Sequence, residues 1–229
     1  MTKAFVSWSG GKDCCLAYYR AKQQGLWVCS LFNMAREDGS RSRSHGLSTE
    51  LLNMQAQAMG LTLVQGQATW DDYKTEFERV LTTLHQQGFT DGVFGDIDYA
   101  ENRKWEEDVC RNCGIAARLP IWGENQDALL REFIDAGFRA IVVVVKAEVM
   151  GPEWLGRELN DTFVADLTAA GGITPCGEAG EFHSLVIDGP LFNHSLVIEQ
   201  AEKVRREGHW FLDIQKASLS SGEKEAALK

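Results

Sequence analysis

Residues 3–21, KAFVSWSGGKDCCLAYYRA, decide the fold, because they join an apolar strand to a helix through two glycines. Residues 3–9 are an apolar run typical of a buried strand, and a helical pattern follows over residues 13–24. A strand that leads directly into a helix is the first half of a βαβ unit. In the open parallel sheets built from such units, ligands bind beyond the carboxyl ends of the strands. The loop at residues 9–13 is therefore the first candidate site.

The alternation of strand and helix continues along the first half of the chain. We expect strands or extended segments at residues 26–34, 61–67, 91–97 and 116–122, and helices at 48–60, 71–87 and 102–113. Ser48 is expected to cap the second helix, and Gly60 to end it. This order predicts an α/β domain with an open parallel sheet and helices on both of its faces.

The pattern loosens after residue 122. We expect a helix at 125–136, a buried strand at 138–147, a helical stretch at 152–172, and a Gly-rich turn with a strand at 174–192. The second half is either a smaller domain or an extension of the first sheet. The predicted division is an α/β domain at 1–122, a smaller C-terminal α/β domain at 123–215, and a flexible tail at 216–229.

The composition is that of an ordinary globular protein, with 44% hydrophobic and 24% charged residues in a chain of 229. A net charge of -10 disfavours nucleic-acid binding, which needs a basic face. The sequence shows no signal peptide, and its longest apolar run, residues 140–145, is too short to span a bilayer. The six cysteines are expected to be reduced thiols. We therefore expect a cytoplasmic protein with no membrane partner.

The loop at residues 9–13, Ser-Gly-Gly-Lys-Asp, carries groups that bind an anion. Two successive glycines let backbone N–H groups point into one concavity, and the helix that follows adds its positive end. Lys12 supplies a charge and Ser9 a hydroxyl donor, while Asp13 either holds Mg²⁺ or caps the helix. The spacing fits neither the Walker loop nor the Gly-x-Gly-x-x-Gly fingerprint. The loop thus indicates a phosphate site, with a plain tight turn as the alternative.

Residues 9–14 closely resemble the PP-loop, Ser-Gly-Gly-x-Asp-Ser, of the N-type ATP pyrophosphatases. Cys14 stands where that motif usually has serine, and a thiol is a weaker hydrogen-bond donor. The resemblance implies a HUP-like domain that binds ATP and Mg²⁺ and cuts ATP between the α and β phosphates. The nucleotide site that it implies consists of Ser9, Gly10, Gly11, Lys12, Asp13 and Cys14, with His45 as a further candidate for the pocket. Asp13 would be the metal ligand. For His45, a surface loop histidine is the alternative.

A second region, residues 174–192 (TPCGEAGEFHSLVIDGPLF), brackets carboxylates with glycines, which permits a sharp loop close to a ligand. A solvated acidic turn is the alternative. Together with the PP-loop, this region resembles the Glu-Gly-Gly-Glu-Tyr/Phe-x-Thr/Ser signature of the diphthine-ammonia ligase family. Ala179 replaces one of the two central glycines of that signature. Residues 94–115, 119–145 and 153–167 fit the same family, so the resemblance covers residues 3–192.

This resemblance implies an ATP-dependent amide synthesis, with ATP bound by the domain at 1–122 and the acceptor substrate by the domain at 123–215. The carboxylate of diphthine, on a modified histidine of translation elongation factor 2, would be adenylated and then attacked by ammonia, with release of AMP and pyrophosphate. The residues implied on the acceptor side are Gly177, Glu178, Gly180, Glu181, His183 and Ser184. Lys12, Asp13 and Glu181 would be catalytic. Asp96, at the end of the strand expected at 91–97, is assigned to the substrate side. The alternative is that Asp96 only stabilises a turn or caps a helix.

Three other functions stay compatible with the residues. The same chemistry could act on a corrinoid carboxylate in cobalamin salvage. Cys110, Cys113 and Cys176 could form the three-thiol cluster of a PP-loop tRNA sulfur transferase. For the first two cysteines, two small buried residues one turn apart on a helix face are the favoured explanation. The chain could also be a non-catalytic nucleotide-binding module. An exposed C-terminal helix or edge strand could form a homodimer.

Overall fold

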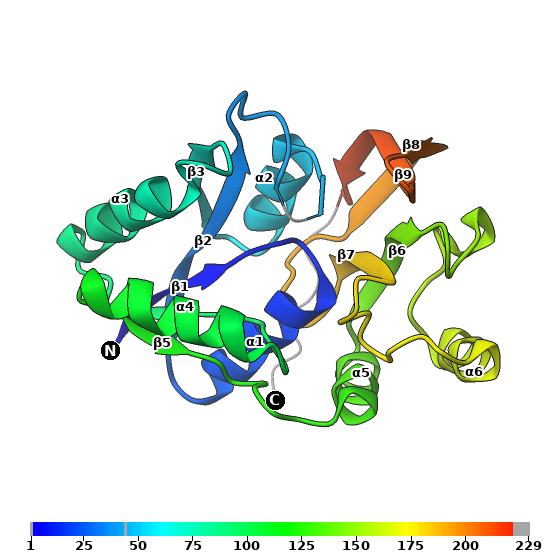
Figure 1. The fold of residues 1–229 in the computed structure, drawn as a ribbon, viewed down its shortest axis with the longest axis horizontal. Coiled ribbons are helices and arrows are strands. Elements are labelled where there is room, and N and C mark those ends of the chain that lie inside the picture. Colours follow the sequence, from blue (N-terminus) through cyan, green and yellow to red (C-terminus); the bar gives the residue numbers. More distant parts are fainter. Residues whose placement is uncertain (1, 44, 222–229) are drawn as a thin grey trace. The chain divides into compact units, whose positions relative to one another are not determined.

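The computed structural model describes residues 2–43 and 45–221, and it divides the chain into two compact units (Figure 1). The first unit runs to Gly123 without the short piece Ala58–Gly60, which groups with the second unit from Glu124 onward. Each unit is built on its own sheet. The second half of the chain is therefore not an extension of the first sheet. The assignment of ATP and acceptor binding to separate parts stays a prediction.

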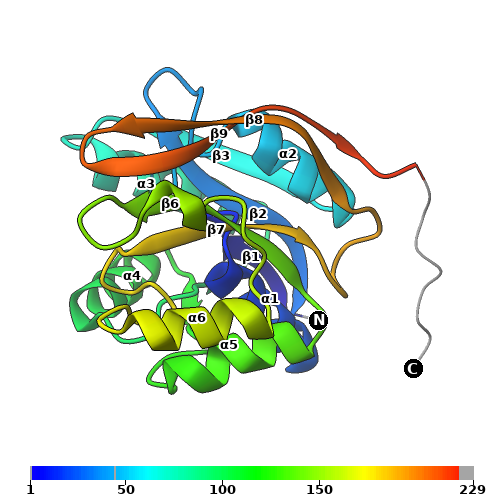
Figure 2. The ribbon, with the colours of Figure 1, turned by 90° about the vertical axis from the view of Figure 1, so that its right-hand side faces the viewer.

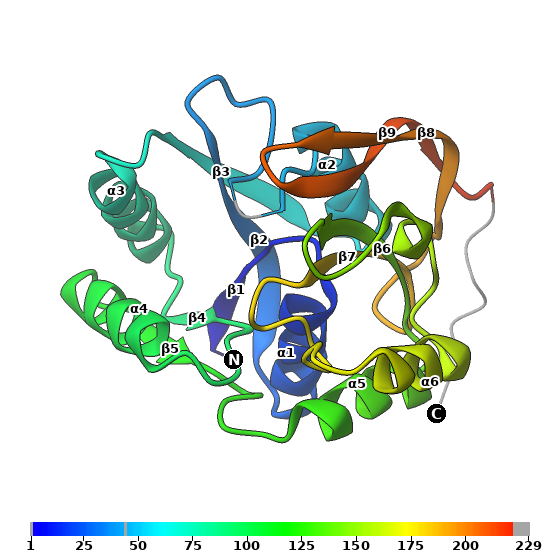
Figure 3. The ribbon, with the colours of Figure 1, turned by 45° about the vertical axis from the view of Figure 1, so that its right-hand side comes forward.

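The sheet of the first unit is parallel throughout, with the strand order β3-β2-β1-β4-β5. Its strands are β1 (Lys3–Ser7), β2 (Trp27–Arg36), β3 (Thr62–Ala68), β4 (Asp91–Val93) and β5 (Ala116–Arg118). Its helices are α1 (Lys12–Gln23), α2 (Thr49–Ala58), α3 (Tyr73–Gln86) and α4 (Ala100–Asn112). Figure 3 shows α1 and α2 on one side of this sheet and α3 and α4 on the other. The predicted open α/β fold is confirmed.

The strand order places a topological switch point between β1 and β4. The chain moves outward from β1 to β2 and β3, and then returns to the other side of β1 to form β4 and β5. The loops that follow β1 and β4 therefore leave the carboxyl edge of the sheet in opposite directions, and doubly wound proteins bind ligands at such a point. These two loops contain Ser9–Gly11 and Gly95–Tyr99.

Aromatic packing fixes β1 in the centre of this sheet. The buried ring of Phe5 meets Phe32 of β2 edge-on, with ring centroids 5.7 Å apart, and meets Phe94 after β4 at 6.3 Å. Gly92 makes room for this ring, because a Cβ there would lie 2.5 Å from Phe5 Cζ. The loop that carries the phosphate-binding motif thus starts from a rigid strand.

The second unit has an antiparallel sheet with the strand order β7-β6-β9-β8. Its strands are β6 (Arg139–Lys146), β7 (Phe182–Asp188), β8 (Leu196–Arg206) and β9 (His209–Leu219). Its helices are α5 (Gln126–Asp135), the 3-10 turn η1 (Pro152–Trp154) and α6 (Asp161–Ala170). The helical stretch expected at 152–172 is wrong over residues 155–160, where Leu155 is extended and Glu158 forms a bridge with Ile141.

The long hairpin of β8 and β9 was not expected from the sequence (Figure 2). Its turn consists of Glu207 and Gly208, with φ angles of 47° and 79°, as a two-residue hairpin turn requires. Glutamate is an unusual first residue for such a turn, so the sequence did not indicate a hairpin at this position. Residues 216–219 belong to β9, so the predicted tail is wrong there, and residues 222–229 of that tail lie outside the described residues.

Strand β8 lies at the edge of the second sheet, with most of its side chains exposed or half-buried. This is the kind of edge that the expected homodimer would need, and the oligomeric state stays a prediction. No helix in the described part of the chain is long and apolar enough to cross a membrane.

Candidate functional site

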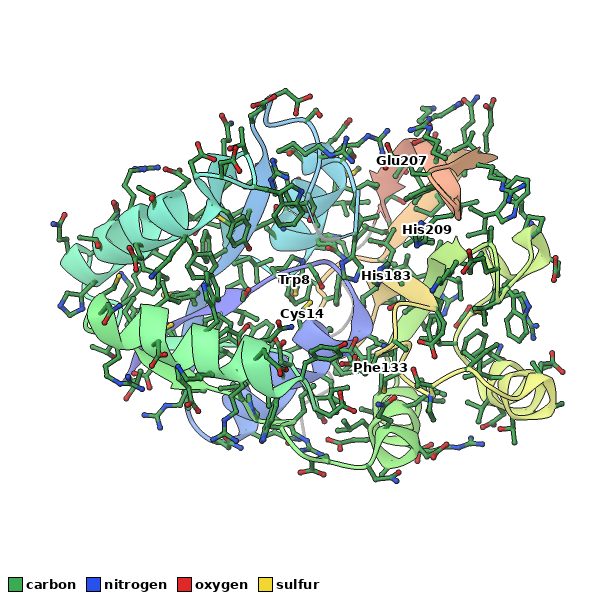
Figure 4. The ribbon with its side chains drawn as sticks, viewed as in Figure 1. Trp8, Cys14, Phe133, His183, Glu207 and His209 are labelled. Atoms are coloured by element: carbon green, nitrogen blue, oxygen red, sulfur yellow. The ribbon has the colours of Figure 1, made fainter. Side chains whose placement is uncertain are left out.

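The PP-loop (residues 9–14) connects β1 to α1 at the switch point of the first sheet. Gly11 is the N-cap of α1, and no side chain caps the helix. The first turn closes through a hydrogen bond from the N–H of Cys15 to the carbonyl of Gly11, at 3.3 Å. An uncapped helix start presents N–H groups and the positive end of the helix dipole, which together favour an anion. Figure 4 labels Trp8, which directly precedes this loop, and Cys14, its last residue.

Gly10 lets the loop make its turn. Its φ of 90° lies in the left-handed region, and a Cβ there would lie 2.7 Å from Leu47 Cδ1 and 3.0 Å from Gln55 Oε1. Any larger residue would therefore both strain the backbone and push α2 away. The predicted nest depends on glycine at this position for two separate reasons.

Gln55 of α2 holds the loop from one side. The fully buried side chain donates from Nε2 to the carbonyl of Gly10 at 3.0 Å, and its Oε1 accepts from Trp8 Nε1 at 2.8 Å. Ser48, predicted to cap this helix, accepts from the N–H of Leu51 at 3.2 Å, which confirms the cap. Gln55 was missed in the sequence. Its signal is a polar residue on the apolar face of α2, four residues after Leu51.

Lys12 and Asp13 form an ion pair at the start of α1. Lys12 is only 4% exposed, and its Nζ lies 2.8 Å from Asp13 Oδ2. Burial raises the pKa of the Asp13 carboxyl, the neighbouring Lys12 opposes this change, and the charge of Asp96 adds to it. A buried lysine needs an anionic partner. In this loop, Asp13 supplies that anion next to the helix start.

The side chain of Cys14 bonds within its own loop. Its Sγ donates to the carbonyl of Gly11 at 3.2 Å and lies 3.3 Å from Ser9 Oγ, which in turn lies 3.4 Å from the N–H of Gly11. Burial raises the pKa of the Cys14 thiol, so it stays protonated. The cysteine therefore replaces the usual serine as a group that closes the loop.

The loop after β4 lies against the PP-loop. Gly95 approaches the start of α1 so closely that a Cβ there would lie 2.6 Å from the backbone nitrogen of Cys14. The next residue, Asp96, is half-buried and accepts a hydrogen bond from Asn102 Nδ2 at 3.0 Å. The structure therefore brings Asp96 together with the PP-loop, as its predicted place at the end of a strand requires.

His45 lies in the long loop between β2 and α2, where it is half-buried. The same loop reaches the PP-loop through Leu47, whose side chain fills the space next to Gly10. The loop of His45 is thus one wall of the region around Gly10. A role of His45 in the nucleotide pocket stays a prediction.

In the second unit, Glu181 closes the loop that precedes β7. Its side chain is 4% exposed and accepts three hydrogen bonds. Oε1 accepts from the N–H of Thr174 at 2.7 Å, and Oε2 accepts from Thr174 Oγ1 at 2.9 Å and from the N–H of Ala179 at 3.0 Å. Gly177 permits this tight loop, since a Cβ there would lie 2.5 Å from the carbonyl oxygen of Phe182.

The other predicted acceptor residues do not share one surface. Glu178 and Gly180 are half-buried in this loop. His183 and Ser184 are consecutive residues of β7, so their side chains point to opposite faces of the sheet. Ser184 is 2% exposed, whereas His183 is half-buried. Of these two, His183 is therefore better placed to meet a ligand.

Replacing Glu181 with alanine should lower the free energy of unfolding by about 2 kcal/mol, because it removes all three hydrogen bonds that the buried carboxylate accepts. The urea midpoint of the full chain measures this change. Glu148→Ala is the control, since that carboxylate is 80% exposed in the same unit. Equal midpoints for the two variants would contradict the loop-closing role of Glu181.

Both halves of the chain match domains of a known protein family. The description "Diphthamide synthase N-terminal domain" matches residues 2–117, and "Diphthamide synthase C-terminal domain" matches residues 125–220. The chain belongs to the diphthamide synthase family. This membership confirms the predicted family and the prediction of an ATP-dependent ligase.

Relatives in the diphthamide synthase family match along nearly the whole chain. A protein of Mus musculus named diphthine–ammonia ligase is 28% identical, over 93% of this chain and 88% of that protein. The protein of the same name from Homo sapiens is 25% identical, over 90% of this chain and 86% of that protein. Among solved structures, a predicted subunit of tRNA methyltransferase from Methanocaldococcus jannaschii covers 82% of this chain and 98% of its own, with 14% identity and a TM-score of 0.46.

The cysteines of this diphthamide synthase family member have separate surroundings. Burial raises the pKa of Cys110 to about 12. Cys113 Sγ donates to the carbonyl of Glu78 at 3.6 Å, and Cys176 Sγ donates to the carbonyl of Gln126 at 3.4 Å. Within residues 2–43 and 45–221, no three His, Cys, Asp or Glu side chains are grouped to hold a metal ion. The three-thiol cluster is therefore not formed among these residues.

Proposed function

We propose that this chain is an AMP-forming amide ligase that adenylates a carboxylate and transfers the acyl group to ammonia. The PP-loop at the switch point of the parallel sheet, with the buried cation of Lys12 at the helix start, carries the proposal. The names of the relatives support diphthine as the acceptor. In this proposal, translation elongation factor 2 carries the diphthine.

The reaction divides into two displacements. In the first, a carboxylate oxygen of the acceptor attacks the α-phosphorus of ATP, the bond to the bridging oxygen of the β-phosphate breaks, and pyrophosphate leaves. In the second, the nitrogen of ammonia attacks the acyl carbon, AMP leaves with the former carboxylate oxygen, and the amide nitrogen loses a proton. Adenylation is needed because a carboxylate is a poor electrophile and AMP is a good leaving group.

The residues of the PP-loop supply what the first displacement needs. Negative charge grows on the departing pyrophosphate, and the backbone of Gly10 and Gly11, the start of α1 and Lys12 face that charge. Ser9 and Cys14 keep the loop closed. Asp13 is the carboxylate that would hold Mg²⁺ entering with ATP, and the bound ion neutralises phosphate charge. A single carboxylate suffices, since Mg²⁺ in such sites takes most of its ligands from phosphate and water.

The remaining predicted residues belong to the acceptor side in this proposal. Asp96 lies next to the PP-loop, where it would face the carboxylate or the ammonia. In the second unit, Glu181 shapes the loop that carries Glu178, and His183 offers a side chain for the acceptor. His45 belongs to the nucleotide side.

The nucleotide product tests the proposal. The purified chain is incubated with ATP, Mg²⁺ and ammonium, with or without elongation factor 2 that bears diphthine, and AMP is resolved from ADP. We expect AMP and pyrophosphate in equal amounts, dependent on both the acceptor and ammonium. Elongation factor 2 without the modification, and a free corrinoid carboxylate, serve as comparison acceptors. Formation of ADP would contradict the proposed cleavage between the α and β phosphates.

A further inference from the structure

Glu106 is a buried carboxyl group that the proposed function does not use. It lies on the core-facing side of α4 with Val109 and Cys110, and only 8% of its surface is exposed. Within the described residues, no hydrogen-bond donor reaches its buried Oε2. Burying an ionised carboxylate in this way is very costly, whereas burying a neutral acid costs far less. The position therefore favours a carboxyl group that keeps its proton.

The neighbour of Glu106 is Asp96, in the loop after β4. The charge of Asp96 and a hydrogen bond to it both favour the protonated form of Glu106 and raise its pKa. Asn102, one turn before Glu106 on the same helix, donates to Asp96 Oδ1 at 3.0 Å. A hydrogen bond between two carboxyl groups needs a proton, since two carboxylates can only accept. Glu106 therefore donates, and two residues at i and i+4 on α4 hold Asp96 together.

The groups around Glu106 all favour its neutral form. Burial raises its pKa to about 10, and the charge of Asp96, the hydrogen bond to Asp96 and the charge of Glu107 add to the effect. Tyr73 of α3 and Cys110 of α4 also interact electrostatically with Glu106, and their own pKa values are both raised to about 12. Both are therefore neutral at pH 7 and offer no positive charge.

Asp96 connects Glu106 to the PP-loop. It follows Gly95, whose Cα lies so close to α1 that a Cβ would lie 2.8 Å from both the carbonyl carbon of Asp13 and Cys14 Cα. The charge of Asp96 also raises the pKa of Asp13. The position of the Asp96 charge therefore affects the pKa of Asp13, the residue that would hold Mg²⁺.

We propose that Glu106 is a positioning residue, which as a neutral acid donates a hydrogen bond to Asp96 and fixes that carboxylate beside the PP-loop for the adenylation or amide-forming step. This inference rests on the proposed function. Glu106 itself is buried, so it acts through Asp96 and does not touch the substrate.

The test compares two substitutions that differ in one property. Glu106→Gln keeps a donor of nearly the same shape, whereas Glu106→Ala removes the donor. Both are assayed for AMP formation from ATP, ammonium and elongation factor 2 that bears diphthine. We expect Glu106→Ala to lower kcat by about tenfold to a hundredfold, as misplacement of a group at a reacting centre does. Glu106→Gln should keep kcat within about threefold of wild type. KM for ATP should change little in either variant.

Glu107→Ala is the control, because Glu107 lies one position further on α4, is 37% exposed, and pairs with Arg103. It should leave kcat unchanged. Thermal unfolding of each variant shows whether it is folded under assay conditions. If Glu106→Ala does not fold, Asp96→Ala and Glu106→Gln carry the comparison, and Asp96→Ala should lower kcat while Glu106→Gln does not. Equal kcat values for Glu106→Gln and Glu106→Ala would overturn the inference.

An infrared measurement separates this inference from the proposed function. The difference spectrum of wild type minus Glu106→Gln at pH 7 should contain the band of a protonated carboxyl group, with no substrate present. Absence of the band overturns the inference, whatever the enzyme makes. A band together with no AMP from the wild type would instead overturn the proposed function, and with it the role of the pair in catalysis.

Discussion

Lys12→Ala should lower kcat/KM for AMP formation by about 100-fold to 1000-fold, the effect of removing one preorganised charge that faces a developing negative charge. Lys12 is 4% exposed at the start of α1, so its charge is poorly screened by water. The loss should appear in kcat more than in KM, because the charge on the leaving pyrophosphate is largest in the transition state. Initial rates of AMP release over a range of ATP concentrations measure both constants.

The matched control is Lys22→Ala, which removes the same charge from the last turn of the same helix. It should leave kcat/KM within about twofold of wild type, since the field of a surface charge is screened within about 10 Å at ordinary salt. Because Lys12→Ala also leaves Asp13 without its ion-pair partner, thermal unfolding of both variants is compared first. A folded Lys12→Ala variant with wild-type activity would contradict the assignment of the PP-loop.

The second large effect concerns stability against pH. With the Glu106 pKa raised from 4.5 to about 10, the folded state holds a proton between these values that the unfolded chain has lost. The stabilising contribution is thus complete below pH 4.5 and is lost as the pH rises toward 10. Relative to Glu106→Gln, the free energy of unfolding of the wild type should fall by about 1.4 kcal/mol per pH unit.

Urea unfolding of wild type and Glu106→Gln at pH 6 and pH 8 measures this difference, which should amount to about 3 kcal/mol over the two units. Comparing the two proteins cancels the contributions of all other titrating groups. Glu107→Gln controls for removal of a carboxylate from the same helix. A difference between wild type and Glu106→Gln that does not change with pH would mean that Glu106 is ionised in the folded protein.

The parallel sheet and the loop at residues 9–14 could be predicted from the sequence because their signals are local. Residues 3–24 contain the strand, the two glycines and the helix in one stretch, and the alternation that follows has few solutions other than a parallel sheet. The position of Asp96 followed from the same rule, since the carboxyl ends of parallel strands share one edge. The hairpin of β8 and β9 was not predicted, because its turn begins with Glu207 and not with a residue typical of such turns.

The residues that support the site could not be read in the same way. Gln55 and Glu106 are polar side chains on buried helix faces, and only the tertiary contacts reveal what each one holds. Glu181 was predicted from a family motif to be catalytic, and the structure adds three hydrogen bonds by which it closes its own loop. Sequence patterns indicate where a loop is, whereas satisfied or unsatisfied hydrogen bonds indicate what keeps it in shape.

The insertion of β4 next to β1 also sets the order in which the site can form during synthesis. A nascent chain that has emerged only as far as β3 already contains the PP-loop and α2 with Gln55. It does not yet contain β4 and the loop after it, which carries Gly95 and Asp96. Gly95, which packs closely against the backbone of Cys14, is synthesised only after about ninety residues of the chain have been made. Because pairing distant segments is slow compared with local folding, the candidate site is expected to be completed late, after the PP-loop and α2 have formed.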